Sequence, residues 1–162
     1  LDAMNLKIDA IFHSSSSGGT QAGIVSGLQL FGMNDVKDIG VSPDDSSESI
    51  GGEVRRVIRG VGEMLGVELN DQMTVLDEYT GDGYGIPSPE GEEALAILAR
   101  VEGIVLDPVY TAKAMAAFRA TGTMRASAAQ LLRARGIFDA GRLDDSGTLR
   151  VIAEALRDTG EL

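Results

Sequence analysis

The sequence predicts an α/β fold with three layers, in which a mostly parallel sheet is flanked by helices, together with a helical C-terminal tail. Its 162 residues, 43% of them hydrophobic, suit a domain with a single hydrophobic core. Short apolar runs alternate with longer segments of helical periodicity, and this β-α-β-α order implies parallel strands joined by right-handed crossovers. The 21 glycines cluster without a fixed period, which indicates turns and not a repeat.

The first strand and the first helix are separated by a stretch rich in serine and glycine. Residues 6–12 form an apolar run that stops at four serines and two glycines, as a buried strand does where it enters a loop. A helix is predicted over residues 20–31, because Ile24 and Leu28 recur at helical spacing. Gly32 is placed to end that helix, since glycine readily adopts the left-handed conformation found there.

A second strand, a long amphipathic helix and a third strand follow. The second strand is expected at residues 36–41, and the polar turn 42–47 leads into the helix. The third strand is expected at residues 73–76. The apolar face predicted for the long helix contains Ile50, Val54, Val57, Ile58, Val61, Met64 and Leu65.

A glycine-rich loop, residues 80–87, separates the third strand from two further helices. The helix that begins at residue 88 has an N-cap serine, a proline at its first position and acidic residues near the positive end of its dipole. Gly103 ends this helix, and a short apolar segment leads into another helix at about residues 109–120.

The character of the sequence changes after residue 120. Alanine- and arginine-rich stretches predict helices at 123–135 and 147–158, joined by a polar segment. We therefore divide the chain into an α/β domain, residues 1–120, and a helical tail, residues 121–162.

Charge and composition exclude several classes of partner. The net charge of −11 argues against a nucleic-acid surface or an anionic membrane, because both require clustered lysine and arginine. A small molecule is the expected partner. With no cysteine and one histidine, His13, the chain is not expected to bind a metal ion, and the lack of cysteine fits a cytoplasmic protein. No apolar run is long enough to suggest a membrane span.

The serine- and glycine-rich stretch, residues 14–20, is the strongest local signal for a binding site. Glycines allow the backbone to approach a phosphate closely, and the start of a helix offers free N–H groups beside the hydroxyls of Ser17 and Thr20. The pattern matches neither a Walker A loop nor the dinucleotide-binding fingerprint. A phosphate-binding loop and an ordinary flexible turn both fit the pattern.

Three motifs recur in order along residues 6–118. They are Ser-Gly-Gly-Thr-Gln-Ala-Gly at 17–23, Gly-Asp-Gly-Tyr-Gly-Ile-Pro at 81–87, and the segment 99–116 that contains Asp-Pro-Val-Tyr-Thr. Together they resemble the D-cysteine desulfhydrase and 1-aminocyclopropane-1-carboxylate deaminase family, whose members are fold-type II enzymes similar to the β subunit of tryptophan synthase. The resemblance implies that the chain is a C-terminal portion of such an enzyme and that the cofactor is pyridoxal 5′-phosphate (PLP).

Site residues follow from the resemblance, motif by motif. The residues that would bind the cofactor phosphate are Ser17, Gly18, Gly19 and Thr20. Tyr84 and Tyr110 match the two active-site tyrosines of the family, although packing alone is an alternative role for them. A phenol that acts as a general base would need a lowered pKa. Thr111 is the third catalytic candidate; deaminases are expected to carry an acid at this position, so threonine favours α,β-elimination on a D-amino acid.

The resemblance also implies that one essential group lies elsewhere. The family's lysine that binds the cofactor covalently belongs upstream of these motifs, and Lys7, Lys37 and Lys113 do not match it. The enzyme hypothesis is therefore a portion of a PLP-dependent lyase that converts D-cysteine to pyruvate, sulfide and ammonia, with ring opening of aminocyclopropane carboxylate as the alternative reaction. The other hypothesis is a non-catalytic module that binds phosphate or a partner. An incomplete sheet would favour a homo-oligomer or association with a complementary fragment.

Overall fold

The computed structural model of the chain describes residues 8–121. The helices predicted at 123–135 and 147–158, and all but the first residue of the predicted tail, lie outside this part, so the division into two domains stays a prediction. The described elements are β1 (Ala10–Ser14), α1 (Gly19–Leu30), β2 (Lys37–Val41), α2 (Ser47–Leu65), β3 (Thr74–Leu76), α3 (Pro89–Glu102) and α4 (Thr111–Ala120).

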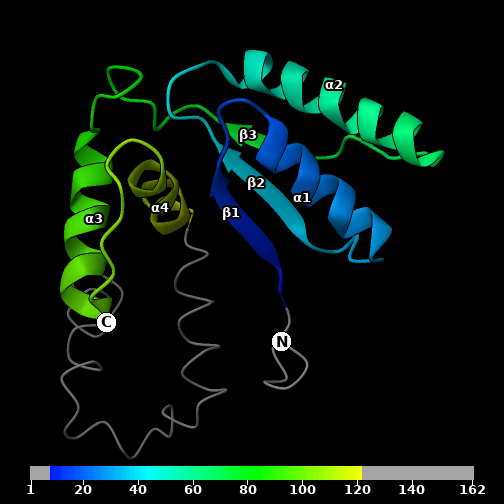
Figure 1. Ribbon diagram of the computed structural model, residues 1–162. Helices are drawn as coiled ribbons and strands as arrows, with labels where there is room; N and C mark the ends of the chain where they lie inside the picture. The colour runs from blue at the N-terminus through cyan, green and yellow to red at the C-terminus, as the bar shows by residue number, and fades with distance from the viewer. Residues whose placement is uncertain (1–7, 122–162) are drawn as a thin grey trace, which may run out of the picture.

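Three parallel strands form the middle layer of the fold. Their order is β1-β2-β3, with Ala10 opposite Lys37 and Ile39 opposite Thr74. Figure 1 shows α1 and α2 on one side of this sheet and α4, backed by α3, on the other. The predicted three-layer α/β architecture with a parallel sheet is therefore confirmed.

The first two helices share a core with one face of the sheet. Buried side chains of α1 and α2 form a hydrophobic cluster. The partly buried side chains of Met73, just before β3, and Val75, in β3, pack against this cluster. The apolar face predicted for α2 is wrong at its end, where Met64 is 77% exposed. Gly62 is the last buried residue of α2, so the final turn lies beyond the cluster. The buried members of this cluster are Ala22, Val25, Ile50, Val54 and Ile58.

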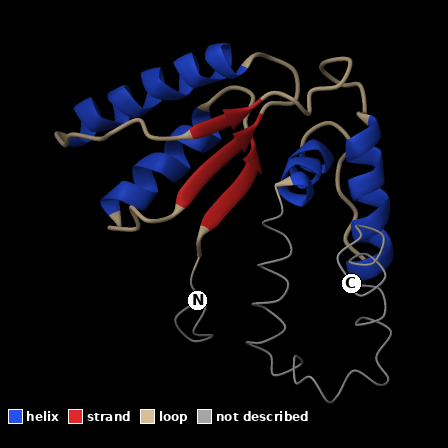
Figure 2. Cartoon of the chain, turned by 180° about the vertical axis from the view of Figure 1, so that it is seen from behind, coloured by secondary structure: helices blue, strands red, loops and turns tan. Residues whose placement is uncertain are grey.

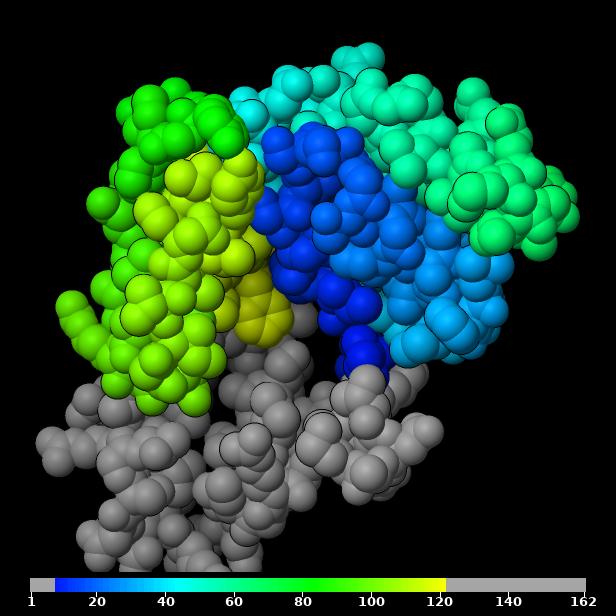
Figure 3. Space-filling model, in the orientation of Figure 1, coloured from blue at the N-terminus to red at the C-terminus, as the bar shows by residue number. Residues whose placement is uncertain are grey.

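The opposite face of the sheet is covered by α4. Val41 of β2 is buried against Ala114 and Ala117 of this helix. At the edge strand, the rings of Phe12 and Phe118 meet edge to face, with their centroids 5.2 Å apart. The view from behind shows α3 packed on the outer side of α4 (Figure 2), and in the space-filling view α4 lies directly beside the blue surface of β1 and the start of α1 (Figure 3).

The end of β1 and the start of α4 differ from their predicted positions, and the structure shows why. The first strand extends to Ser14 instead of ending at residue 12, because its ladder with β2 continues to the pair Ser14 and Val41. The last described helix begins at Thr111, not near residue 109, because the Asp107 carboxylate accepts the N–H groups of the residues before it. This carboxylate supplies the hydrogen bonds that the first N–H groups of a helix lack.

A polar network is buried between α1 and the sheet. His13 contacts the Asp38 carboxylate through Nε2 at 3.0 Å, and the side-chain amide of Gln21 donates to the same carboxylate at 2.6 Å. The Gln21 amide also donates to the carbonyl of Thr74, at 2.9 Å. Gly40 leaves room for this arrangement, since a Cβ there would lie 2.3 Å from the Gln21 side-chain oxygen. The network thus joins all three strands to the helix that follows the serine-rich loop.

Removing the N-cap of α3 is expected to destabilise the protein. Ser88 is buried, and its hydroxyl accepts the N–H of Gly91 at 3.2 Å. Ser88→Ala should lower the free energy of unfolding by about 1 kcal/mol, whereas Ser88→Gly should cost only a few tenths, because glycine is tolerated at N-caps. Urea titration followed by circular dichroism measures both losses. Equal losses would show that packing of the serine, and not capping, is what matters.

Candidate functional site

Three loops meet the carboxyl edge of the sheet, which lies at the top of Figure 1. They follow β1, β2 and β3 and span residues 15–18, 42–46 and 77–88. In open parallel sheets this edge is where ligands bind. Two of the three loops carry the motifs that the sequence singles out.

The loop after β1 is open where a phosphate would have to bind. Ser17, Gly19 and Thr20 are exposed, and Gly18 is buried at the N-cap of α1 with φ 78°. A Cβ at Gly18 would lie 3.0 Å from the backbone nitrogen of Val54, so glycine at this position allows the loop to approach α2. The four predicted cofactor residues are therefore brought together at the start of one helix.

The donors of this loop fit a phosphate ester. No side chain caps the start of α1, and the first N–H groups of a helix have no partner within the helix itself. A Cβ added at Gly19 would meet nothing within 4 Å, so the space over the helix end is free. The buried hydroxyls of Ser14, at the end of β1, and of Ser15, at the start of the loop, have no hydrogen-bond partner within the described residues. Free donors beside a positive helix end are what phosphate binding requires.

The two predicted tyrosines meet. The hydroxyl oxygens of Tyr84 and Tyr110 lie 2.6 Å apart, and the rings contact edge to face with their centroids at 6.1 Å. Tyr84 comes from the glycine-rich loop, and Tyr110 immediately precedes α4. Tyr84 is 61% exposed, so its ring is accessible to a substrate from solvent.

The environment of Tyr110 favours the protonated form of its phenol. The hydrogen bond with Tyr84 raises the pKa of Tyr110, and partial burial and the negative charges of Asp44 and Asp107 raise it further. Tyr110 therefore lacks the lowered pKa that a general base would need. The pair is instead suited to donating hydrogen bonds or a proton.

Breaking the phenol pair should lower the pKa of Tyr110. Tyr84→Phe removes the hydrogen bond that contributes most to the raised pKa. Tyrosinate absorbance reports the titration directly, because the chain has no tryptophan and three tyrosines. Tyr79→Phe is the matched control, which should remove one titrating phenol and leave the pKa of Tyr110 raised. An unchanged Tyr110 titration in Tyr84→Phe would contradict the observed pairing.

The hydroxyl of Thr111 is occupied within its own turn. It donates to the Asp107 carboxylate and accepts the N–H of Asp107. Burial alone would raise the pKa of Asp107, but the hydrogen bonds from Thr111 and from two neighbouring N–H groups outweigh it and lower that pKa. The structure therefore places Thr111 beside Tyr110 as part of a helix cap. Its catalytic role stays a prediction.

Comparison with known proteins identifies the family of this chain. Residues 1–133 match the model of the family described as pyridoxal-phosphate dependent enzyme. The chain belongs to this family. PLP is the cofactor of the family, and the predicted resemblance is thereby confirmed.

Two relatives show which branch of the family is similar. A Thermotoga maritima protein, named as a proposed 1-aminocyclopropane-1-carboxylate deaminase, is 43% identical over 116 residues, which are 70% of this chain and 36% of that protein. A crystal structure described as that of an ACC deaminase homologue superposes with a TM-score of 0.65 and 31% identity, covering 70% of this chain and 34% of that one. The chain thus spans about a third of the length of both relatives.

Lys113, which the sequence analysis does not include among the site residues, lies close to the predicted tyrosines in the chain. Lys113 is fully buried, and its ammonium group bonds to the loops after β2 and β3. A signal was present, since Lys113 lies among alanines on the face of a helix that packs against the sheet. Its partners could not be read from sequence, because they are backbone carbonyls.

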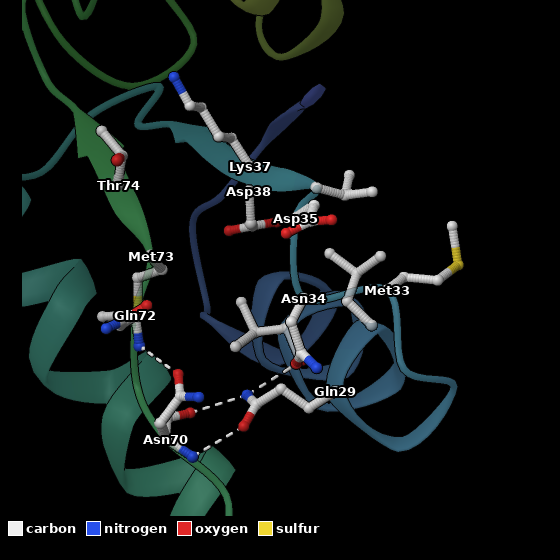
Figure 4. A pocket seen from close by; sticks show the side chains of 13 residues that line it. Gln29, Met33, Asn34, Asp35, Lys37, Asp38, Asn70, Gln72, Met73 and Thr74 are labelled. Atoms are coloured by element: carbon white, nitrogen blue, oxygen red, sulfur yellow. Dashed lines mark hydrogen bonds between the residues drawn. The ribbon is translucent and has the colours of Figure 1, made fainter. Parts of the chain in front are cut away.

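One surface hollow lies away from the PLP-family motifs. A hollow of about 390 Å³ is lined by the end of α1 and by the starts of β2 and β3, at the opposite edge of the sheet (Figure 4). Gln29 bridges it through two hydrogen bonds to the backbone of Asn70. In the described part of the chain, no cluster of three or more histidine, aspartate or glutamate side chains is arranged to hold a metal ion. Nor do residues 8–121 contain a helix long and apolar enough to cross a bilayer.

Proposed function

We propose that this chain supplies the phosphate-binding loop and a hydrogen-bonded pair of phenols, of which Tyr84 donates the proton, to a PLP-dependent lyase that acts on a small amino acid. The observation that carries the proposal is the contact between the Tyr84 and Tyr110 hydroxyls, at the same sheet edge as the open loop of residues 17–20. When bound, PLP supplies an electron sink for negative charge at the substrate Cα. The lysine that would bind it covalently is expected from another part of the protein.

The chain's own residues divide the work of binding and proton donation. Ser17 and Thr20, with the N–H groups at the start of α1, would hold the phosphate and so fix the position of the cofactor. Tyr84 is the exposed phenol and would contact the substrate, while Tyr110 keeps its proton and orients Tyr84 through their hydrogen bond. A protonated phenol can donate to a leaving group as negative charge develops on it.

We favour α,β-elimination on D-cysteine as the reaction of the whole protein. The Cα–H proton would pass to the lysine expected from another part of the protein, and its bonding electrons would form the Cα=Cβ double bond. The Cβ–S bond would break with its electron pair on sulfur, and the proton of the Tyr84 phenol would neutralise the departing thiolate. Hydrolysis then consumes one water, so that the products are pyruvate, sulfide and ammonia. The support for this choice is Thr111, which stands where deaminases are expected to carry an acid.

Ring opening of aminocyclopropane carboxylate is the second candidate, and the names of both relatives favour it. The two reactions are distinguished by assaying the full-length protein with D-cysteine and with aminocyclopropane carboxylate. Sulfide release from the first supports elimination, and release of ammonia from the second without activity on D-cysteine supports the deaminase. A protein that binds the cofactor and turns over neither substrate would support the non-catalytic module.

Binding of the cofactor phosphate can be tested on the chain itself. Pyridoxamine 5′-phosphate is the suitable probe, because it has no aldehyde to react with surface lysines. Gly19→Ala places a methyl group in the open space over the helix end and should weaken binding about tenfold or more, a loss of about 1.4 kcal/mol or more. Gly23→Ala is the matched control, since Gly23 is also exposed in α1 with nothing within 4 Å of an added Cβ. Equal affinities of the two variants would overturn the assignment of the loop.

A further inference from the structure

Lys113 is a buried lysine whose ammonium group is enclosed by backbone carbonyls. Its Nζ donates to the carbonyl of Pro43 at 2.8 Å, of Thr80 at 2.6 Å and of Gly83 at 3.1 Å. An ammonium group has three donors and no acceptor, so these bonds use its whole hydrogen-bonding capacity. Within residues 8–121 no carboxylate forms an ion pair with it, and carbonyl dipoles therefore stabilise the charge.

The three carbonyls come from two loops at the carboxyl edge. Pro43 follows β2, and Thr80 and Gly83 belong to the glycine-rich loop after β3. Gly83 has φ 119°, a conformation that other residues rarely adopt. Gly81 has φ 59°, and a Cβ there would lie 2.9 Å from the Cβ of Ser88. Glycines thus permit the backbone shape that directs two carbonyls of this loop at Lys113.

Lys113 is connected to both of the segments that carry the phenols. Tyr84 directly follows Gly83, whose carbonyl bonds to Lys113. Tyr110 directly precedes α4, and Lys113 lies in the first turn of that helix. Because Tyr84 is largely exposed, packing of its own ring does little to fix its position. Its hydroxyl nevertheless lies 2.6 Å from that of Tyr110.

We propose that Lys113 is a positioning residue that acts as an internal cation, holding the glycine-rich loop so that Tyr84 stays within hydrogen-bond distance of Tyr110. This inference rests on the proposed function, in which the two phenols face the substrate. An uncharged side chain of the same length would leave three carbonyls without their buried donor, and the loop would move to regain hydrogen bonds with water. Burial lowers the pKa of Lys113, and the nearby charge of Asp44 opposes this effect.

The test compares a charged and an uncharged side chain at position 113. The chain has no cysteine, so Lys113→Cys introduces a unique thiol. Alkylating the unfolded variant with 2-bromoethylamine rebuilds the ammonium group, and 1-bromopropane gives a neutral side chain of nearly the same shape. After refolding, the ammonium form should show the raised pKa of Tyr110, measured by tyrosinate absorbance. The propyl form should show the lower value of Tyr84→Phe.

A second variant keeps the test decisive if the propyl form fails to fold. Gly83→Ala changes the loop backbone without filling any space, because a Cβ at Gly83 would meet nothing within 4 Å. It should also lower the pKa of Tyr110, whereas Gly66→Ala, also at a positive φ (67°) but remote at the end of α2, should not. A raised Tyr110 pKa in a folded propyl form or in Gly83→Ala would overturn the positioning role.

Pyridoxamine 5′-phosphate binding separates this inference from the proposed function. Lys113 does not contact the loop of residues 17–20 in any hydrogen bond, so the propyl form should bind the probe as tightly as the ammonium form. Failure of every form to bind the probe would count against the proposed function and leave the Tyr110 comparison intact. A changed phenol titration with unchanged probe binding is the combined result that the inference requires.

Discussion

His13→Leu is expected to lower the free energy of unfolding by about 3–5 kcal/mol, because it leaves the Asp38 carboxylate buried without its charged partner. The two side chains meet at 3.0 Å and are 12% and 2% exposed. The other ring nitrogen of His13 faces the carbonyl of Ser14, so both nitrogens face acceptors. An imidazolium satisfies both contacts, since both of its nitrogens are donors.

The stability lost on replacing His13 should become smaller as pH rises. Burial lowers the pKa of His13, but hydrogen bonds to Asp38 and to the Ser14 carbonyl, with the charge of Asp38, outweigh it and raise that pKa. A raised folded-state pKa gives stabilisation that is complete below the unfolded value of about 6.5 and disappears as pH rises through the folded value.

Urea unfolding from about pH 5.5 to about pH 9 brackets this window. The stability difference between the wild type and His13→Gln should shrink as pH rises, because glutamine does not titrate. His13 is the one histidine in the chain, so NMR titration of its imidazole gives the folded pKa without ambiguity. A pKa at or below the ordinary histidine value would contradict a charged contact with Asp38.

Gly40→Ala is expected to cost about 3 kcal/mol, from steric overlap together with lost buried hydrogen bonds. The added Cβ would lie between 2.3 and 2.7 Å from three atoms of the Gln21 side chain. Gln21 is fully buried and cannot move aside without giving up its bonds to Asp38 and Thr74.

The matched control is Gly52→Ala, in an exposed position of α2 where an added Cβ meets nothing within 4 Å. It should stabilise the protein by about 0.4–1 kcal/mol, because alanine is the better helix former. Chemical denaturation of both variants measures the difference. Similar stabilities for the two would show that Gln21 has a second position that costs little.

Much of the fold was predictable because local chemistry determines it. The cap of α3 needed only Ser88 and Pro89, and both function as their residue types predict. Periodicity placed the buried face of α2 through Ile50, Val54 and Ile58. It failed at Met64, since a pattern of apolar residues does not tell where the partner surface ends.

The residues of the candidate site were likewise predictable in part. Family motifs were sufficient to single out Tyr84 and Tyr110, and the structure brings their hydroxyls together. The carbonyl partners of Lys113 and the contact between Gln21 and Asp38 were not predicted. Both depend on which loops and strands become neighbours in space, and neither leaves a spacing along the chain that a motif could capture.

The hydrogen bond from Gln21 to the Thr74 carbonyl has a consequence for the order of folding. It joins residues 53 positions apart, and Gln21 directly follows residues 17–20, the proposed phosphate-binding loop. Contacts between distant residues form slowly, because the chain entropy of closing the loop between them must be lost first. A nascent chain with only β1, α1 and β2 would lack this contact, so the proposed phosphate-binding loop should reach its final conformation last, when the third strand docks.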